Sequence, residues 1–397
     1  MDPIRNPYAP GAGQRPPELA GRDRELAQFE VVLERIARRR PERSLVLTGL
    51  RGVGKTVLLN ALRSQAITRL WGTGKIEARP EQSLRRPLAG ALHLAIRELA
   101  PRHRDPQAVT HTLGVLKAFA LKTEPGARLR ERWQPGIDAP TVTGRADTGD
   151  LEVDLTELLV DTAALAGDVG VGVALFIDEM QDLAPAELSA LCTAAHELSQ
   201  TAAPLVLVGA GLPHLPGLLS ASRSYSERLF HYLRIDKLDR AATDQALAAP
   251  AAEEGVAIDP GGLDALHAAS DGYPYFVQAY GKAAWDAAPA SPITAADVAV
   301  AAPQAEAELA VGFFGSRYER ATPAERDYLQ AMAELGGPTG DAPVATAQVA
   351  SALRRTPQSL SPARDTLIKK GLVYAAERGQ VAFTVPHFGR FLRGRAQ

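Results

Sequence analysis

The residues best suited to chemistry are a glycine-rich octapeptide, Gly49-Leu-Arg-Gly-Val-Gly-Lys-Thr56. It follows the apolar run 44–48 and precedes leucines at helical spacing, so we expect a strand, a tight turn and a helix. Glycines in such a turn let backbone N–H groups fold around an anion, and the N-terminus of the following helix adds partial positive charge. The pattern G-x-x-x-x-G-K-[ST] in this context predicts a site for a nucleoside triphosphate.

The octapeptide also carries two reactive side chains. Lys55 is expected to reach the β- and γ-phosphates, and the Thr56 hydroxyl is expected to bind Mg²⁺. The alternative, a tight turn with an exposed lysine, is disfavoured by the strand-to-helix context. The predicted nucleotide-binding residues of this segment are Gly49, Leu50, Arg51, Gly52, Val53, Gly54, Lys55, Thr56 and Val57.

Two acidic residues, Asp178 and Glu179, end the uniformly apolar run that starts at Val171. Such a run predicts a buried parallel strand, whose carboxyl end opens onto the ligand crevice of an α/β sheet. Asp178 is therefore expected to hold Mg²⁺, and Glu179 to orient or deprotonate the attacking water. The alternative is that both acids cap the next helix.

Size and composition set broad limits. A chain of 397 residues predicts about two or three domains, and a net charge of −2 argues neither for nor against nucleic acid. The single cysteine, Cys192, lies in an apolar-periodic stretch and suits a reducing cytoplasm. No apolar run approaches the roughly 18 residues of a membrane helix, so we expect a cytoplasmic protein without a membrane partner. The high content of Ala, Arg and Gly suggests a bacterial source.

Residues 1–21 contain five prolines and predict an extended arm. Two interpretations stay open for it. The arm is either a disordered tail, or an apolar cradle in which Pro7, Tyr8, Pro16 and Pro17 contact a purine base.

Residues 22–236 predict the α/β core, in which helices alternate with apolar strands. Within it, residues 101–150 read as a variable insertion to which we assign no chemistry. The strand that begins at residue 205 ends in Gly209-Ala-Gly211, where a polar side chain would otherwise sense the γ-phosphate, and only backbone groups or His214 could substitute. Arg228 is placed to reach a neighbouring subunit's nucleotide, with Arg223 as a weaker candidate, or it pairs with Glu227.

Residues 237–318 predict a small helical lid followed by a linker helix that is broken or bent near Pro303. The turn Gly272-Tyr-Pro274 starts a lid helix and could press on the base or sugar.

Residues 319–397 predict a capped helix, two further helices and a β-hairpin, which is the pattern of a winged helix-turn-helix. From residue 318 onward 11 Lys and Arg residues face 7 Asp and Glu residues. Double-stranded DNA is therefore one expected partner, and packing on the core or on a protein partner is the alternative. The candidate DNA contacts are Ser359, Ser361, Arg364, Lys369, Lys370 and Arg378.

Taken together, these motifs resemble the P-loop ATPases of the AAA+/STAND group, most closely the archaeal-type and origin-recognition-like ATPases that end in a winged helix. The resemblance covers nearly the whole chain except residues 101–150. It implies an α/β P-loop NTPase fold with a helical lid, ATP or ADP with Mg²⁺ as cofactors, and nucleotide roles for Lys55, Thr56, Asp178, Glu179 and Pro274. Two departures, the missing polar sensor and the missing lid arginine after Pro274, favour slow hydrolysis.

The leading hypothesis is an ATP-dependent switch that controls a DNA-binding C-terminal module. The alternative is a STAND-type scaffold, in which nucleotide controls self-association or capture of a protein partner without DNA binding.

Overall fold

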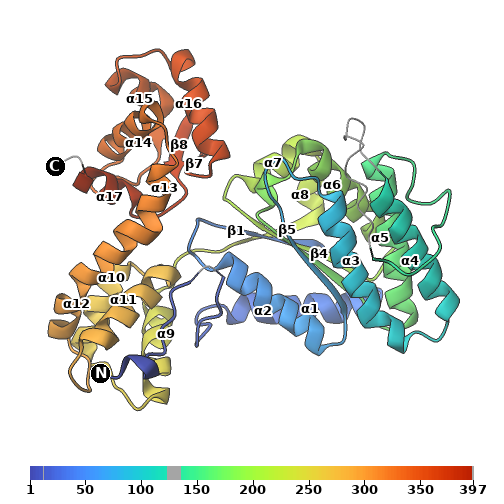
Figure 1. Ribbon diagram of the computed structural model, residues 1–397, viewed down its shortest axis with the longest axis horizontal. Coiled ribbons are helices and arrows are strands. Elements are labelled where there is room, and N and C mark those ends of the chain that lie inside the picture. The colour runs from blue at the N-terminus through green and yellow to red at the C-terminus, as the bar shows by residue number, and fades with distance from the viewer. Residues whose placement is uncertain (12, 123–135, 396–397) are drawn as a thin grey trace.

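The computed structural model describes residues 1–11, 13–122 and 136–395. Figure 1 shows an α/β core at the right, a helical lid at the lower left and a C-terminal module at the upper left. The core sheet is parallel, with the strand order β2-β3-β4-β1-β5. Its strands are β1 (Ser44–Thr48), β2 (Gly72–Glu77), β3 (Val173–Asp178), β4 (Leu205–Gly211) and β5 (Phe230–Arg234).

Helices cover both faces of this sheet, which is why its central strands are apolar throughout. One face packs against α1 (Asp23–Ala37) and α2 (Lys55–Thr68). The other packs against α3 (Arg85–Leu99), α4 (Pro106–Leu121), α5 (Leu151–Asp168) and α6 (Pro185–Gln200). The short helices α7 (Leu215–Ser222) and α8 (Ser226–Leu229) lead into β5.

The segment 101–150 contains more regular structure than its sequence predicted. Helix α4 occupies residues 106–121, and its Val115, Leu116 and Phe119 side chains are completely buried in the core. A buried ion pair between Arg85 and Asp154, at 3.0 Å, ties α3 to α5 beside α4. Residues 123–135 of the predicted insertion lie outside the described residues.

The lid consists of α9 (Arg240–Glu253), α10 (Pro260–Ser270), α11 (Pro274–Ala287) and α12 (Ala295–Glu308). The N-terminal arm, which begins with the 3₁₀ turn η1 (Pro3–Arg5), packs against this lid (Figure 1). Its terminal amine donates to the Ala288 carbonyl at 2.6 Å, and Trp285 donates to the Asp2 carbonyl at 2.9 Å. The described part of the arm is therefore an element of the lid, and the disordered-tail interpretation is wrong for it.

The linker helix departs from α geometry later than expected. Helix α12 runs through Pro303, and the departure is the π-helix η4 (Leu309–Gly315), which continues into α13 (Ser316–Glu319). We call residues 309–320 the connector, because they join the lid to the C-terminal module.

The C-terminal module contains α14 (Pro323–Leu335), β6 (Val344–Ala345), α15 (Thr346–Ala352), α16 (Pro357–Lys369), β7 (Val373–Ala375), β8 (Gln380–Phe383) and α17 (Phe388–Arg395). Thr322 caps α14 and Glu325 returns to the Thr322 N–H, which confirms the predicted capping box. The strands form an antiparallel sheet in the order β6-β8-β7. This arrangement is compatible with the predicted winged helix-turn-helix, to which it adds α17. None of the helices that the structure describes is long and apolar enough to cross a membrane.

Candidate nucleotide-binding site

The phosphate loop, residues 49–56, follows β1 and turns directly into α2, as the sequence predicted. Gly52 and Gly54 have φ angles of 86° and 91°, which glycine adopts at little cost and other residues do not. Gly49 is needed for a different reason, because a Cβ atom there would lie 2.2 Å from the Ile235 carbonyl oxygen. The loop also accepts a bond of 3.2 Å from the buried Arg22 guanidinium to the Val53 carbonyl.

Lys55 is buried and its ammonium group is turned back onto the loop. Its Nζ donates to the carbonyl oxygens of Gly49 at 2.9 Å and Leu50 at 2.8 Å. Burial lowers the pKa of Lys55 to about 8, while Glu179 and Asp178 act in the opposite direction. Lys55 must exchange the two carbonyls for phosphate oxygens when a nucleotide binds.

Thr56 and Asp178 lie together, as the sequence predicted for a metal site. The Thr56 hydroxyl donates to Asp178 Oδ2 at 2.8 Å, and Asp178 is only 4% exposed. A hydroxyl and a carboxylate suit Mg²⁺, which usually takes one or two protein oxygens and completes its shell with water and phosphate. The described residues hold no group of three or more His, Cys, Asp or Glu side chains that could bind a metal alone. The donors present therefore fit Mg²⁺ delivered together with a nucleotide.

Glu179 follows Asp178 with a φ of 52°, an unusual conformation for a residue with a side chain. Its Oε1 lies 3.4 Å from Arg51 Nη1, and its Oε2 accepts from Gln181 Nε2 at 2.5 Å. Gln181 also accepts from the Leu212 N–H at 3.0 Å, so it bridges the ends of β3 and β4.

Gln181 was missed in the sequence, where nothing distinguishes it from other polar residues after a strand. The glycines that replace the expected polar sensor explain its position. A Cβ atom on Gly211 would lie 2.7 Å from Gln181 Oε1, and one on Gly209 would lie 2.0 Å from Met180 Sδ. These glycines therefore make room for the side chains of Met180 and Gln181, which follow β3 in the chain. His214 instead stacks on Tyr374 of the C-terminal module, with ring centroids 6.1 Å apart.

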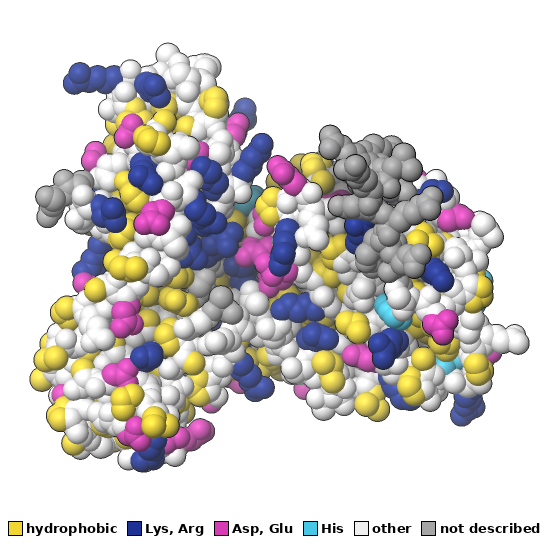
Figure 2. Space-filling view, in the orientation of Figure 1, with side chains coloured by type: hydrophobic (Ala, Val, Ile, Leu, Met, Phe, Trp, Pro, Cys, Tyr) yellow, Lys and Arg dark blue, Asp and Glu magenta, His cyan; other side chains and the backbone are white. Residues whose placement is uncertain are grey.

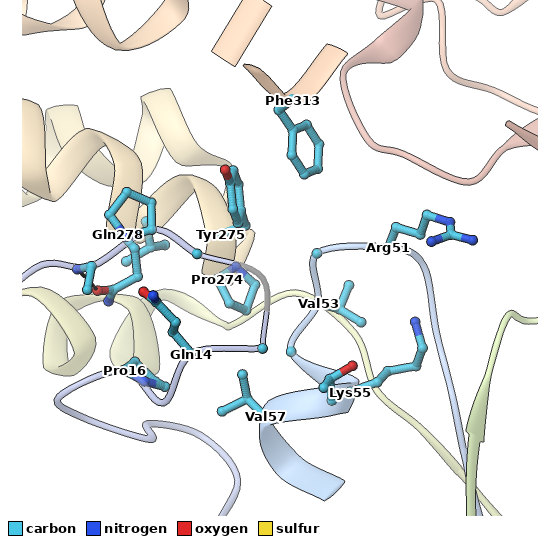
Figure 3. Close-up of a pocket in the computed structure, with 18 of the residues that line it drawn as sticks. Gln14, Pro16, Arg51, Val53, Lys55, Val57, Pro274, Tyr275, Gln278 and Phe313 are labelled. Atoms are coloured by element: carbon cyan, nitrogen blue, oxygen red, sulfur yellow. Dashed lines mark hydrogen bonds between the residues drawn. The ribbon is translucent and has the colours of Figure 1, made fainter. Parts of the chain in front are cut away.

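A cavity of about 700 Å³ opens above the phosphate loop. It is enclosed by the N-terminal arm, the lid and the connector as well as the core. Figure 3 shows Gln14, Pro16, Pro274 and Gln278 on one side of this cavity, and Arg51 and Lys55 on the other. Its lining residues from the core are Arg22, Arg51, Gly52, Val53, Gly54, Lys55, Thr56, Val57 and Glu179.

Pro274 lines the cavity, as expected, but Tyr8 and Pro17 do not. Tyr8 is 3% exposed in the core of the lid, where its hydroxyl donates to the Leu247 carbonyl at 2.5 Å, and this burial raises the pKa of Tyr8. Pro17 points to solvent. Of the four predicted cradle residues only Pro16 lines the cavity, and Gln14 of the arm lines it as well.

Arg228 lies on α8, is exposed, and is not part of the cavity lining. Among the described residues its side chain has no hydrogen bond or ion pair, so the alternative of a pair with Glu227 is not observed. The weaker candidate, Arg223, forms two hydrogen bonds of 2.7 and 2.6 Å to the Glu152 carboxylate. This ion pair holds Arg223 within its own subunit.

The C-terminal module touches the phosphate loop through Arg51. The Arg51 N–H donates to the Thr384 carbonyl at 2.8 Å, and a Cβ atom on Gly371 would lie 2.7 Å from Arg51 Nη2. Arg51 therefore contacts the module and Glu179 at the same time. Figure 2 shows Lys and Arg side chains of the module facing Asp and Glu side chains across the hollow between module and core.

The six candidate DNA contacts are in different surroundings. Lys370 is half-buried and bonds to the Glu325 carboxylate at 2.6 Å, and Arg364 pairs with Asp365 at 3.0 Å. Lys369 and Arg378 are exposed. The two serines bond to backbone near the start of α16, Ser359 to Thr356 and Ser361 to Pro357.

Residues 18–208 match the family described as AAA ATPase domain, and this part of the chain is an AAA+ P-loop ATPase domain. Residues 311–392 match a family described as a domain of unknown function, DUF8462. No curated protein matches the chain.

Several solved structures resemble the chain over most of its length. The Walker-type ATPase PABY2304 of Pyrococcus abyssi is 16% identical, covers 96% of this chain and 97% of its own, and has a TM-score of 0.57. The RuvB Holliday junction branch migration motor of Thermotoga maritima is 17% identical, with coverages of 94% and 96% and a TM-score of 0.46. The ORC1 protein of Aeropyrum pernix, solved in complex with DNA, is 15% identical, with coverages of 96% and 94% and a TM-score of 0.44. The likeness to the Pyrococcus protein establishes the fold.

Proposed function

We propose that the protein is an ATP-binding, slowly hydrolysing Mg²⁺-dependent switch that controls the position of its C-terminal module. The proposal rests on the two contacts of Arg51, one with the C-terminal module and one with Glu179. This residue belongs to the phosphate loop, donates its N–H to Thr384 of the module, and lies 3.4 Å from the predicted catalytic carboxylate of Glu179. A change in the phosphates bound at this loop can therefore displace the module through a single residue, Arg51.

The chain's own groups divide the chemistry of the proposed reaction. Lys55 and the loop N–H groups bind phosphate oxygens, and Thr56 and Asp178 would hold Mg²⁺, which neutralises charge on the phosphates. Glu179 is the candidate group that orients or deprotonates the attacking water. Its contacts with Arg51 and Gln181 occupy both carboxylate oxygens. Hydrolysis is then slow as long as the module keeps Arg51 beside Glu179.

Two measurements test this function directly. Calorimetry with ATPγS and Mg²⁺ should show binding that Asp178→Asn weakens, and a phosphate-release assay should show ATP hydrolysis that Glu179→Gln reduces while binding remains. Wild-type protein that binds no adenine nucleotide at saturating Mg²⁺ would refute the proposal.

Double-stranded DNA is the proposed partner of the module, through the exposed Lys369 and Arg378. A protein that contacts phosphates loses DNA affinity steeply as salt rises. We therefore expect salt-dependent binding to duplex DNA, weakened by the double change Lys369→Ala/Arg378→Ala. The matched control is Arg240→Ala, which removes a lid arginine that pairs with Asp244 and Asp264.

The second candidate function is a STAND-type scaffold without DNA binding. It is favoured by the ion pairs of Lys370 and Arg364, because two of the predicted DNA contacts are bound to carboxylates of their own module. Absence of DNA binding at low salt on several duplexes, together with ATP-dependent oligomers in light scattering, would select this function over the first.

A further inference from the structure

The connector carries two arginines, Arg317 and Arg320, that line the nucleotide cavity together with Lys55 and Glu179. No sequence motif predicts a role for them, because they lie after the lid and before the C-terminal module. The π-helix η4 precedes them immediately. Isolated π turns occur often at functional sites, since they turn side chains away from their α-helical positions.

Phe313 fixes the connector directly above the phosphate loop. A Cβ atom on Gly52 would lie 3.7 Å from Phe313 Cζ, and the Phe313 ring stacks on Tyr275 with centroids 4.5 Å apart. Figure 3 shows both rings pointing into the cavity from opposite the loop. Arg317 lies one turn further along, and its guanidinium stacks over the Phe313 ring at 4.2 Å. The same aromatic group therefore holds Arg317 close to the phosphate loop.

The positive charge at this end of the cavity is not balanced by acids. The hydrogen bond of Arg317 goes to the Phe313 carbonyl of its own helix, and among the described residues neither Arg317 nor Arg320 pairs with a carboxylate. Burial lowers the pKa of Arg317 to about 10, with further contributions from the charges of Arg51 and Arg320. The carboxylates that line the cavity are Glu179, beside Arg51, and Glu18, which accepts from Gln245. A cluster of guanidinium groups in a half-buried cavity is stabilised by an anionic ligand.

We propose that Arg317, with Arg320 beside it, binds the γ-phosphate of ATP from within the same chain. This inference rests on the proposed function and names the residues that distinguish triphosphate from diphosphate. The γ-phosphate is expected beside Lys55 and Glu179, which line the same cavity as Arg317 and Arg320. ADP leaves Arg317 on the Phe313 ring. The connector then supplies the arginine that is missing from the lid turn after Pro274.

The opposite side of the connector holds the C-terminal module. The ring of Phe314, the neighbour of Phe313, stacks on two rings of α17. Its centroid lies 6.1 Å from the centroid of Phe388 and 5.2 Å from that of Phe391. A movement of Arg317 toward a γ-phosphate is therefore passed on to α17 through the adjacent residue pair Phe313 and Phe314. The connector becomes the part of the chain that reports which nucleotide is bound.

The test compares the affinities of full-length protein for ATPγS and ADP, each with Mg²⁺, by calorimetry. Arg317→Ala should weaken ATPγS binding by about 10- to 100-fold and ADP binding by less than about threefold. The reason is that the bidentate contact between the Arg317 guanidinium and the γ-phosphate exists only in the triphosphate complex. Arg317→Lys should fall between these values. The matched control is Arg326→Ala, which removes an arginine stacked on Tyr318 at 4.6 Å outside the cavity lining and should leave both affinities unchanged.

Equal losses for the two nucleotides, or no loss for either, would overturn the inference. Lys55→Ala in the same series separates its failure from that of the proposed function. If the wild type binds both nucleotides and Lys55→Ala weakens both, while Arg317→Ala leaves their ratio unchanged, only the role of Arg317 fails. If the wild type binds neither, the proposed function and this inference fail together. Should Arg317→Ala unfold in a thermal melt, Arg317→Lys gives the ratio instead.

Discussion

Replacement of Lys55 by alanine removes the ammonium group that points onto the phosphate loop. In the structure Lys55 Nζ has two carbonyl partners, at 2.9 and 2.8 Å. Nucleotide binding exchanges them for phosphate oxygens, where two charge-assisted bonds contribute about 1.5–3 kcal/mol each. The two carbonyl bonds given up carry charge on the donor alone and lie at the low end of the same range, about 1.5 kcal/mol each, so with the phosphate bonds near its upper end the net loss in Lys55→Ala is about 2–3 kcal/mol. This loss corresponds to an increase in the Kd for ATP of about 30- to 150-fold.

Calorimetry with ATPγS and Mg²⁺ measures this increase, and a thermal melt checks that the variant is folded. The released Gly49 carbonyl is buried and the Leu50 carbonyl is partly buried, so we expect the variant to stay folded but to lose about 1–3 kcal/mol in free energy of unfolding. The control is Lys282→Ala, which removes a half-exposed lid lysine paired with Asp286. A folded Lys55→Ala protein whose Kd stays within about threefold of the wild type would refute the assignment of the phosphate loop.

Three further predictions concern the reaction, the pH dependence and the stability. Glu179→Gln should lower the rate of ATP hydrolysis by about 10²- to 10⁴-fold in a phosphate-release assay while ATPγS still binds, and an unchanged rate removes its catalytic role. The pKa of Lys55 is lowered to about 8, and phosphates bound beside it raise this pKa, so above pH 8 Lys55 should take up a proton when the nucleotide binds. The affinity for ATPγS should therefore fall as pH rises above 8, by at most tenfold per pH unit. Calorimetry in buffers of different ionisation enthalpy detects this proton, and Lys55→Ala should abolish its uptake. Arg85→Met should destabilise the protein by about 3–5 kcal/mol in urea unfolding, since it leaves the Asp154 carboxylate buried and unpaired, and a loss below about 1 kcal/mol would contradict that.

The sequence predicted the parts of the site that depend on local backbone geometry. A glycine-rich turn between strand and helix and two acids at the end of an apolar strand have fixed positions in a parallel sheet. The pair Thr56 and Asp178 was accordingly expected across 122 residues of chain and lies at 2.8 Å. The capping box at Thr322 is equally local and is also confirmed.

The contributions of the arm, the lid and the connector could not be predicted in the same way. Tyr8 and Pro16 are both suitable neighbours for a base, and only tertiary packing decides that Tyr8 enters the lid core and Pro16 the cavity. Gln181 occupies the space beside Gly211, where a polar sensor was expected, because the glycine has no side chain to exclude it. Arg317 lines the cavity directly after a π-helix, and neither the π-helix nor the position of Arg317 has a recognised sequence pattern here.

Helix α4 was missed for a related reason. Its moderate apolar pattern lies next to residues 123–135, outside the described part of the chain, and the polar cluster before residue 150 suggested an irregular segment. The polar cluster instead satisfies a buried carboxylate, since the Thr148 hydroxyl and N–H both bond to Asp154 Oδ1, at 2.7 and 2.8 Å. A cluster of turn-forming residues can thus belong to a packed core when it surrounds a buried charge.

The central claim is that the nucleotide in the cavity controls the position of the C-terminal module, and a distance between core and module tests it most directly. Spin labels at Ser220→Cys on α7 and Ser351→Cys on α15 suit this measurement, because both positions are exposed and the single native Cys192 is fully buried. Pulsed electron paramagnetic resonance should give one distance distribution with ADP and a shifted one with ATPγS and Mg²⁺, and Lys55→Ala should remove the shift at nucleotide concentrations that saturate only the wild type. Identical distributions in wild-type protein whose saturation by both nucleotides is verified by calorimetry would contradict the claim.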